Sequence, residues 1–557
     1  MKKIIEKMFI DFMPKSLEII KKGYNFSLFQ RDCISGLTVS IVSLPLALAL
    51  AIASGLAPIQ GMYTAIIASL VVAIFGGSRF QISGPTGVFA IIILDTIQRF
   101  GYDGLLATML LTGIMLIFLG ICKLGNYVRY IPYSVVIGFM AGVGLTLITT
   151  QVGDLLGFVN LVLPKGFIAR WSIYFSHIFN SNLYALSIGC FSLIIYIFIK
   201  KIFPRKPAYL IILIVMTVIS FIFKLPVETI GSKYGDLPSM LPVPHIYSFN
   251  NDLLRNVFPI ALTLALLTAV ESLLSAKVVD SMSGDIHNPN SELIAEGFAN
   301  IACMTFSGMP ATGTIARTAT NFNANAYSPI SGVMHSFFLF LFMFFLSPLV
   351  RYIPLSSLAT ILIIVGWNML DFSKMWVLVK FNTGGRYTLI ITILLTILVD
   401  LGVAITIGFI AAALVYLYRL IKEKNVEEDN VFASKADHVL SQKLRDKGVI
   451  VIRVTAPLFL GVVSRISQFL NSEKMKVKVV ILRMGHVSLI DEDGANFIVD
   501  FIKKMRKKRV KVIISNVKYQ PKKMIRYSCI NSKMRYSSIL IAKDYDEAIS
   551  EAKKYIK

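Results

Sequence analysis

Glu271 is a single carboxylate inside an otherwise uncharged, apolar stretch that covers residues 258–276. A charged side chain at the centre of a bilayer is costly, so acidic residues in membrane helices usually face a cavity and bind protons, ions or substrate. We therefore predict that this stretch is a membrane helix whose carboxylate takes part in ion-coupled transport.

Two short segments, 83–95 and 307–321, open with glycine and proline and are poor candidates for complete membrane spans. Paired interruptions of this kind in the two halves of a transporter are the best sequence indication of its binding site. Glycine permits a close approach of backbones, and proline fits the first turn of a half-helix. Non-helical backbone at membrane depth persists only where it lines a cavity or is buried in protein. The two segments therefore predict a binding site near the middle of the membrane.

The predicted site is suited to an anion. An odd number of spans per repeat inverts the second copy relative to the first, so the two half-helices can point their N-termini at each other. The unpaired N–H groups and positive dipole ends of two helices would then attract an anion. Arg317 adds a full positive charge one turn into the second half-helix.

The elements that must position these residues are membrane helices. The chain has 557 residues, of which 55% are hydrophobic and 16% charged, and its mean hydropathy of +0.69 is far too high for a soluble protein. Apolar runs of spanning length predict about fourteen membrane segments. They lie at roughly 34–52, 60–76, 85–98, 104–122, 133–152, 183–202, 207–224, 256–276, 292–307, 313–326, 328–348, 355–370, 386–400 and 402–421.

The distribution of Lys and Arg predicts that both termini lie on the cytoplasmic side of the membrane. Two short predicted outer loops contain neither residue, and longer outer loops carry less weight. Residues 1–15 are basic but contain Glu6 and Asp11, so we interpret them as a cytoplasmic lead-in and not as a signal peptide. The predicted inner loops carry Lys123, Arg129, Lys200, Lys201, Arg205, Lys206, Lys374, Lys380 and Arg386.

The net charge of +24 would suggest nucleic acid as the partner of a soluble protein. Here the basic residues concentrate in the lead-in, the loops and the C-terminal part, so we predict contact with anionic lipid and no nucleic acid. The five cysteines show no disulfide or zinc spacing, and the histidines show no metal-binding pattern. Without a nucleophile–base pair, a metal set or a phosphate loop, the sequence predicts neither an enzyme nor a cofactor.

The composition changes after Leu420. A charged linker precedes strand-like and helical stretches that alternate, which predicts a small α/β domain with a partly parallel sheet. The strands are expected at 448–454, 477–483 and 510–515, and the helices at about 459–473 and 492–508. The predicted organisation is a lead-in at 1–30, a transporter domain at 31–421, a linker at 422–437 and a C-terminal domain at 438–557.

Four motifs carry a family resemblance: 82–87 (ISGPTG), 269–275 (AVESLLS), 290–300 (NSELIAEGFAN) and 310–319 (PATGTIARTA). They resemble the sulfate permease (SulP) family, known in animals as solute carrier family 26, and look most similar to its bacterial C4-dicarboxylate and bicarbonate branches. The C-terminal part resembles the STAS domain of that family. The similarity covers nearly the whole chain after the lead-in.

The resemblance implies an α-helical, uracil-permease-like membrane domain with spans arranged as a seven-plus-seven inverted repeat, followed by an α/β STAS domain. A core domain, made of segments one to four and eight to eleven, would move like an elevator against a gate domain, usually in a homodimer. Family substrates include sulfate, bicarbonate, chloride, oxalate and dicarboxylates. What the STAS domain binds is left open.

The resemblance also implies the site residues. The anion site of the family lies between the third and tenth segments and matches Thr86, Phe89, Gly313, Thr314, Ala316 and Arg317. Its coupling-ion site on the eighth segment matches Glu271 and Ser275. Sodium-coupled bicarbonate relatives carry aspartate at this acidic position and many proton-coupled relatives carry glutamate, so we favour protons and keep sodium as the alternative.

Two departures from the family pattern affect the expected substrate and regulation. Many sulfate and chloride members carry Pro-Gln in the first segment, whereas this chain has Pro45-Leu46, with Leu50 where an aromatic residue often lies. Fewer polar groups favour a dicarboxylate or bicarbonate over sulfate. The serine that is phosphorylated in soluble STAS relatives is replaced by Asp493, before Gly494, which argues against serine phosphorylation there.

We predict that proton and anion bind together from outside and are released together in the cytoplasm, and that Glu271→Gln abolishes proton-driven accumulation. Burial disfavours the carboxylate form and a nearby arginine favours it. A structural alternative has Arg317 pairing with Glu271, since intramembrane charges often pair. The hydroxyls of Thr86 and Ser275 have capping or back-bonding as their structural alternative.

We interpret the other acidic residues as structural. Glu292 and Glu296, one turn apart beside Asn300, are predicted to form an interfacial helix face or a core–gate contact, with a ligand role as the less favoured alternative. Asp95, Asp154 and Asp400 are expected to be solvated at helix ends. Two functional classes remain as alternatives: a uracil-permease-like nucleobase carrier, and a STAS-bearing sensor or channel without coupled transport.

Overall fold

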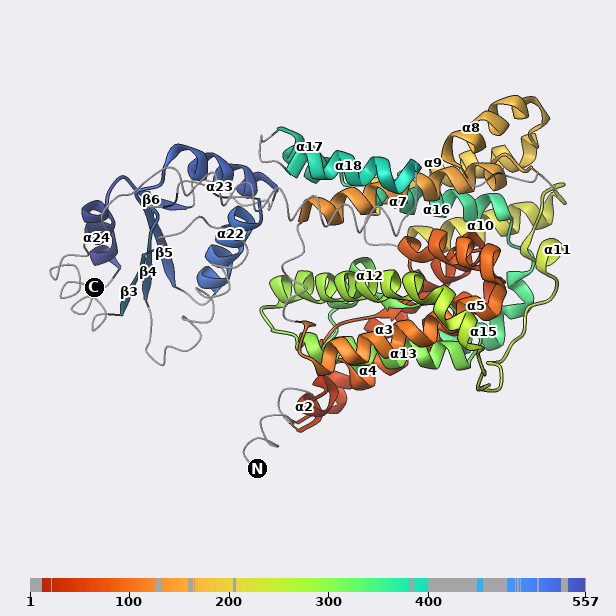
Figure 1. Cartoon of the computed structure of the whole chain (residues 1–557), viewed down its shortest axis with the longest axis horizontal. Coiled ribbons are helices and arrows are strands. Elements are labelled where there is room, and N and C mark those ends of the chain that lie inside the picture. Colours follow the sequence, from red (N-terminus) through yellow and green to blue (C-terminus); the bar gives the residue numbers. More distant parts are fainter. Residues whose placement is uncertain are drawn as a thin grey trace. The chain divides into compact units, whose positions relative to one another are not determined.

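The structure is a computed structural model that describes residues 13–21, 23–125, 133–158, 164, 166–203, 207–380, 385–398, 448–453, 478–485, 487, 490, 492–507, 510–531 and 539–555. The chain forms two compact units, one helical and one that contains the α/β C-terminal part. Figure 1 shows the elements of both.

The first part of the helical unit has long apolar helices interrupted by one short strand. Its elements are α2 (Lys15–Lys21), α3 (Phe26–Ala53), α4 (Pro58–Phe75), β1 (Ser83–Gly84), α5 (Gly87–Ile121) and α7 (Tyr133–Leu155). The third and fourth predicted segments both lie within α5, which is interrupted at Gly101, where φ is 68°. Glycine adopts this left-handed conformation at little cost, so it can turn the chain between two spans.

The remaining helices of this unit follow in the order α8 (Phe167–Ser176), η1 (Ile178–Asn180), α9 (Leu183–Ile202), α10 (Ala208–Ile222), α11 (Ile230–Tyr234), α12 (Asn251–Ser283), α13 (Pro289–Thr305), β2 (Thr312–Gly313), α14 (Ile315–Asn323), α15 (Ile330–Val350), α16 (Leu355–Met369), α17 (Phe372–Lys380) and α18 (Gly385–Leu398). α17 and the start of α18 group with the second unit. Among the described residues, seven helices are long and apolar enough to cross a membrane.

The predicted apolar segments agree with these helices. Each of them, from the first to the thirteenth, falls on a helix of the structure. The fourteenth segment (402–421) lies outside the described residues, as do Arg129, Arg205, Lys206, Asp400 and the linker 422–437. At the predicted helix ends, Asp95 pairs with Arg99 at 2.8 Å and Asp154 pairs with Lys233 at 3.6 Å.

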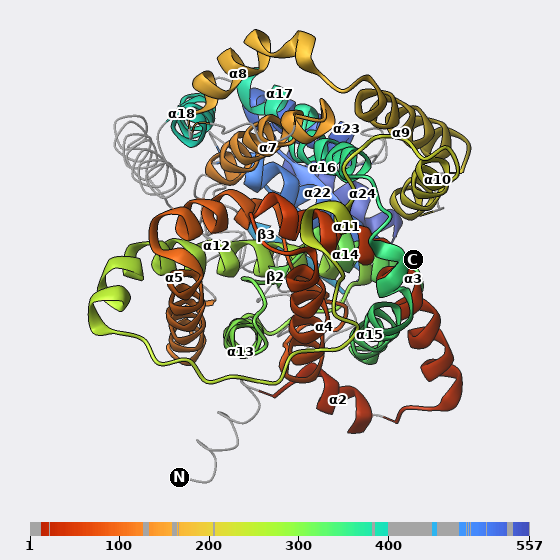
Figure 2. The same ribbon diagram turned by 90° about the vertical axis from the view of Figure 1, so that its right-hand side faces the viewer.

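The same order of elements occurs twice in the helical unit. The first series is α3–α4–β1–α5 and the second is α12–α13–β2–α14–α15. Each consists of two helices, a two-residue strand and then one or two more helices. The two sets exchange partners: α5 packs against α12 and α13, and α15 packs against α3 and α4. In Figure 2, β2 lies between α4, α12 and α13. The two halves are therefore intertwined around the strands.

Glycine makes the closest of these contacts possible. On α5, a Cβ atom at Gly113 would lie 2.7 Å from the carbonyl oxygen of Gly297 on α13, and one at Gly297 would lie 2.6 Å from the carbonyl oxygen of Gly113. Small residues let membrane helices approach to backbone contact, where packing and weak polar contacts hold them.

The C-terminal unit contains a four-stranded parallel sheet in the order β3 (Val449–Arg453), β4 (Val479–Arg483), β5 (Lys511–Ser515) and β6 (Leu540–Ala542). α22 (Glu492–Lys507) and α23 (Tyr519–Asn531) cover one face, and α24 (Tyr545–Lys554) covers the other (Figure 1). The three predicted strands and the helix at 492–508 are confirmed. The helix expected at 459–473 lies outside the described residues.

Candidate functional site

The two interrupted segments meet in a short antiparallel pair of strands, β1 and β2, and we call this pair the crossing. Ser83 of β1 lies opposite Gly313 of β2, and Gly84 lies opposite Thr312. α5 begins three residues after β1 and α14 begins two residues after β2, with Thr86 and Thr314 as their N-cap residues. Because the strands are antiparallel, the two helices leave the crossing in opposite directions and their N-termini meet there. The predicted pair of facing half-helices is present.

Both strands need glycine for steric reasons. A Cβ atom at Gly84 would lie 2.2 Å from Nη1 of Arg317, and one at Gly313 would lie 1.5 Å from Nε2 of Gln81. Gln81 in turn donates a hydrogen bond to the carbonyl oxygen of Ser272 at 3.1 Å. The glycines thus leave room for side chains that reach across the crossing.

Arg317 reaches from α14 to the segment that precedes α5. Its Nη2 atom donates a hydrogen bond to the carbonyl oxygen of Pro85, and its Nη1 atom is buried without a partner. The side chain is 3% exposed. Among the described residues no carboxylate lies within 4.0 Å of it, so the ion pair with Glu271 considered from the sequence is not formed. The guanidinium is therefore held at the crossing and can still donate hydrogen bonds to a ligand.

Glu271 approaches the crossing from α12. Its Oε1 atom accepts a hydrogen bond of 3.0 Å from the hydroxyl of Thr86, and its Oε2 atom is buried without a partner. The hydroxyls of Ser275 and Thr314 are also buried and unpartnered. Buried polar atoms in native proteins nearly always have a hydrogen-bond partner. These atoms, with Nη1 of Arg317, therefore leave hydrogen-bonding capacity unused beside the N-termini of α5 and α14.

The remaining expected residues take different positions. Phe89 is completely buried one turn into α5, whereas Ala316 is exposed. The first residue of α5, Gly87, faces Leu50, Leu147 and Met369, because a Cβ atom there would lie 3.3–3.7 Å from their side chains. The wall opposite the N-terminus of α5 is therefore apolar and is built by α3, α7 and α16.

The interpretation of Glu292 and Glu296 as an interfacial or core–gate face is wrong. Both side chains are 0% exposed, as is Asn300, and the three form one polar stripe along α13 at intervals of four residues. Glu296 accepts hydrogen bonds from the hydroxyls of Ser83 at 2.9 Å and Ser272 at 3.0 Å. Residues four apart share a helix face, so the sequence places the three side chains together but does not indicate that other elements cover them.

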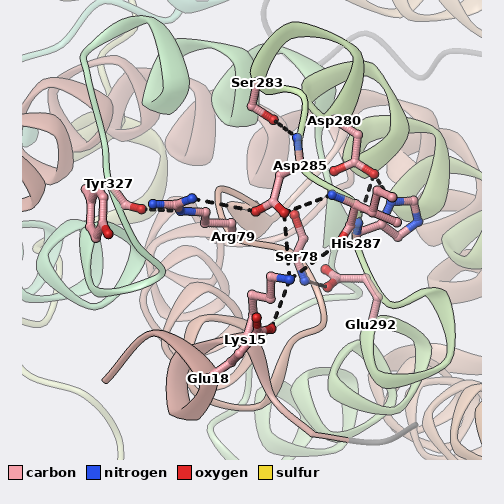
Figure 3. Close-up of polar contacts among 11 residues, drawn as sticks. Lys15, Glu18, Ser78, Arg79, Asp280, Ser283, Asp285, His287, Glu292 and Tyr327 are labelled. Atoms are coloured by element: carbon pink, nitrogen blue, oxygen red, sulfur yellow. Dashed lines mark hydrogen bonds and ion pairs between the residues drawn. The ribbon is translucent and has the colours of Figure 1, made fainter. Parts of the chain in front are cut away.

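The N-terminal end of this stripe, at Glu292, is drawn in Figure 3. Glu292 accepts hydrogen bonds of 2.8 Å from the backbone N–H groups of Gly77 and Ser78, in the loop that leads to β1. Nearby, His287 pairs with Asp280 at 2.6 Å, and Lys15 of α2 lies 3.8 Å from Asp285. Glu292 therefore anchors the loop on which the first half-helix depends.

Asn300 fixes the second half-helix, and Asn300→Ala is expected to loosen it. The Asn300 amide accepts a hydrogen bond from the backbone N–H of Ala311 and donates one to its carbonyl oxygen, both at 3.0 Å. Leaving buried backbone groups unsatisfied costs about 1–3 kcal/mol. We expect a lower melting temperature in detergent and weaker anion binding, measured as a smaller anion-induced rise in that temperature. Equal rises in variant and wild type would contradict this role.

Comparisons with known proteins agree with the geometry. The sequence profile of the sulfate permease family matches residues 29–392, and that of the STAS domain matches residues 442–548. The chain is 34% identical over 507 residues to the putative sulfate transporter YvdB of Bacillus subtilis, covering 90% of this chain and 94% of that protein. It is 28% identical over 475 residues to the bicarbonate transporter BicA of Picosynechococcus sp., covering 81% and 82%.

Solved structures show the same architecture. The transmembrane domain of a cyanobacterial bicarbonate transporter, BicA, matches with a TM-score of 0.61 and 28% identity, covering 70% of this chain and 98% of that one. The structure of SLC26A9 matches with a TM-score of 0.69 over 99% of this chain and 94% of that one, and at 18% identity this supports the fold alone.

Proposed function

Because the chain belongs to the sulfate permease family of membrane anion transporters, we propose that it is a proton-coupled symporter that binds its anion at the crossing of β1 and β2. The observation that carries this proposal is the environment of Glu271. One carboxylate oxygen is held by the N-cap hydroxyl of Thr86 and the other is buried without a partner. A single carboxylate placed in this way at the N-terminus of a half-helix can exchange a proton where the anion binds.

The electrostatics link the two binding events. Helix N-termini and Arg317 favour a negative charge at the crossing, and an ionised Glu271 competes with the anion for that favourable field. Protonation of Glu271 removes the competition, so proton and anion bind together. After movement to the cytoplasmic side, loss of the proton restores the negative charge and expels the anion.

The movement is proposed to follow the elevator mode expected of the fold. The core would consist of α3–α5 and α12–α15, and it would slide past a gate that includes α7 and α16. On the gate side, Leu147 of α7 and Met369 of α16 face Gly87, and such an apolar surface is suited to sliding because it forms no directional bonds with the core. The proposal includes a homodimer in a bacterial inner membrane, with both termini cytoplasmic, a transporter domain at 31–421 and a STAS domain at 438–557.

The same wall bears on the substrate. Leu46 and Leu50 are both buried on α3 and offer no hydrogen bonds, which favours a carboxylate-bearing anion, a dicarboxylate or bicarbonate, over sulfate. One relative is named for sulfate and another for bicarbonate, so both anions stay candidates beside a dicarboxylate.

The decisive experiment is uptake by purified protein in liposomes. Labelled succinate, sulfate and bicarbonate would be offered separately under an inward proton gradient or an inward sodium gradient, with the membrane potential held at zero. Accumulation of any of them above equilibrium with protons supports the proposal and identifies the substrate. Flux that only equilibrates the anion under every gradient would identify a channel or a STAS-bearing sensor.

Sodium coupling is the second candidate, and one observation favours it. Oε2 of Glu271 and the hydroxyl oxygen of Ser275 are both buried and unpartnered, one turn apart on α12. Oxygen ligands of this kind are what a hard cation prefers. Accumulation driven by sodium at equal pH would establish this function in place of proton coupling.

A further inference from the structure

The charges buried around the crossing do not balance. Glu292 and Glu296 have no exposed surface, and one oxygen of Glu271 is also buried. Among the described residues, Arg317 is the only Lys or Arg that is buried. Two of these carboxylates, Glu271 and Glu296, lie near the one guanidinium, and Glu292 is a third buried carboxylate, before a substrate anion is added. Because an uncompensated buried charge is costly and such a group neutralises instead, a second carboxylate besides Glu271 must bind a proton when the anion is present.

The hydrogen-bond partners identify which carboxylate this is. Glu292 is held by two backbone N–H groups, those of Gly77 and Ser78, which can only donate and therefore favour the ionised form. Glu296 is held by the hydroxyls of Ser83 and Ser272. A hydroxyl can donate to a carboxylate or accept from a carboxylic acid, so the site of Glu296 satisfies both protonation states.

Ser272 has a second hydrogen-bond partner, which allows the hydrogen bond between Ser272 and Glu296 to reverse its direction. Its hydroxyl lies 2.8 Å from the hydroxyl of Thr312, and either group can be the donor. When Glu296 carries a proton, Ser272 can turn its hydrogen from Glu296 to Thr312. The same hydroxyl accepts a hydrogen bond of 2.9 Å from the backbone N–H of Gly313 on β2. The protonation state of Glu296 is thereby connected to the backbone of the anion site.

The other titratable groups near Glu296 are few among the described residues. α13 itself contributes Glu292 and the thiol of Cys303, α12 contributes Glu271, and α14 contributes Arg317. α4 carries no charged residue. The contacts from β1 and β2 are made by hydroxyl and backbone groups alone. Arg317 is therefore the positive charge that Glu271 and Glu296 share.

We propose that Glu296 is a second proton-binding carboxylate and that each transport cycle carries two protons with one anion. This rests on the proposed proton coupling at Glu271. Glu296 is sealed from solvent, so its proton must pass the anion site, where Glu271 is the acid that exchanges protons with water. Loss of Glu271 should then stop both protons, whereas loss of Glu296 should stop one.

The stoichiometry is measured as the limiting accumulation in liposomes under an imposed pH difference, with the membrane potential held at zero by potassium and valinomycin. Each coupled proton multiplies the anion ratio by the proton ratio, so one pH unit gives about 100-fold accumulation with two protons and about 10-fold with one. We expect about 100-fold for the wild type and about 10-fold for Glu296→Gln. Glu296→Asp, which keeps an acid, should return toward the wild-type ratio.

Glu292→Gln serves as the comparison on the same helix. It removes a buried carboxylate of the same length. We expect the folded variant to keep the accumulation ratio of the wild type, which corresponds to two protons per anion. A wild-type ratio of about 10-fold per pH unit would overturn the second proton and leave the proposed function intact. An unchanged ratio in Glu296→Gln would overturn the role of Glu296, and no accumulation in the wild type would overturn proton coupling altogether.

Discussion

Glu271→Gln is expected to abolish proton-driven accumulation of the anion while anion exchange across the membrane persists. Glutamine keeps the shape of the protonated side chain and can still accept the hydrogen bond from Thr86. It cannot lose a proton, so the anion no longer needs a proton to bind or to leave. In liposomes, the limiting ratio under a pH gradient should fall to that of passive equilibration.

Two comparisons make this result specific. Exchange of labelled for unlabelled anion at equal pH should continue in Glu271→Gln, which shows that the protein is folded and still binds substrate. Glu271→Asp should retain some coupling, because it keeps an acid but shortens its reach to Thr86. If Glu271→Gln still accumulated anion with the wild-type dependence on the pH gradient, the coupling role of this residue would be wrong.

Arg317→Ala is expected to cause the largest loss of anion affinity. The guanidinium is 3% exposed, keeps one unpartnered nitrogen at the crossing and is the only buried Lys or Arg side chain among the described residues. Truncating one partner of a buried charge pair costs about 2–5 kcal/mol, which corresponds to a rise in KM of roughly 30-fold or more. Arg317→Lys should recover part of the affinity, since lysine keeps the charge and loses the planar fork. The measurement is the concentration dependence of the initial uptake rate.

Gly84→Ala tests whether the position of the Arg317 charge matters, because it displaces the charge without removing it. The added Cβ atom would lie 2.2 Å from Nη1 of Arg317, so the guanidinium must move although it remains charged. We expect a rise in KM in the same direction as for Arg317→Ala. Arg351→Ala is the matched control: that side chain is 46% exposed and pairs with Asp236, and its loss should leave KM unchanged. A KM in Arg317→Ala equal to that of the wild type would remove Arg317 from the anion site.

The positions of the helices and of the anion site could be predicted because each depends on a local pattern. Apolar runs of spanning length located the helices, and the glycine and proline residues before Thr86 and Thr314 located the crossing. The residues that belong to the site by contact, such as Thr86 to Glu271, were assigned through the family resemblance. Composition alone does not predict a hydrogen bond between two residues that lie 185 positions apart, such as Thr86 and Glu271.

The roles of Glu292, Glu296 and Asn300 could not be predicted because they depend on tertiary contacts. A helix with regularly spaced polar residues reads as a solvated or interfacial face when it is considered alone. In the structure the stripe faces inward, since the loop at Gly77, the strand at Ser83 and the backbone of Ala311 offer donors and acceptors for it. Glycine at 297 on the same helix lets α5 approach closely on the neighbouring face of α13.

The exchange of partners between the two halves also governs how the protein can be made. α5 is synthesised long before α12 and α13, against which it packs, and α3 and α4 precede their partner α15. The first half therefore enters the membrane with helix surfaces that nothing yet covers, and with β1 unpaired until β2 has been translated. Neither half can mature on the ribosome by itself. Two separately expressed halves should accumulate only when they are produced in the same cell.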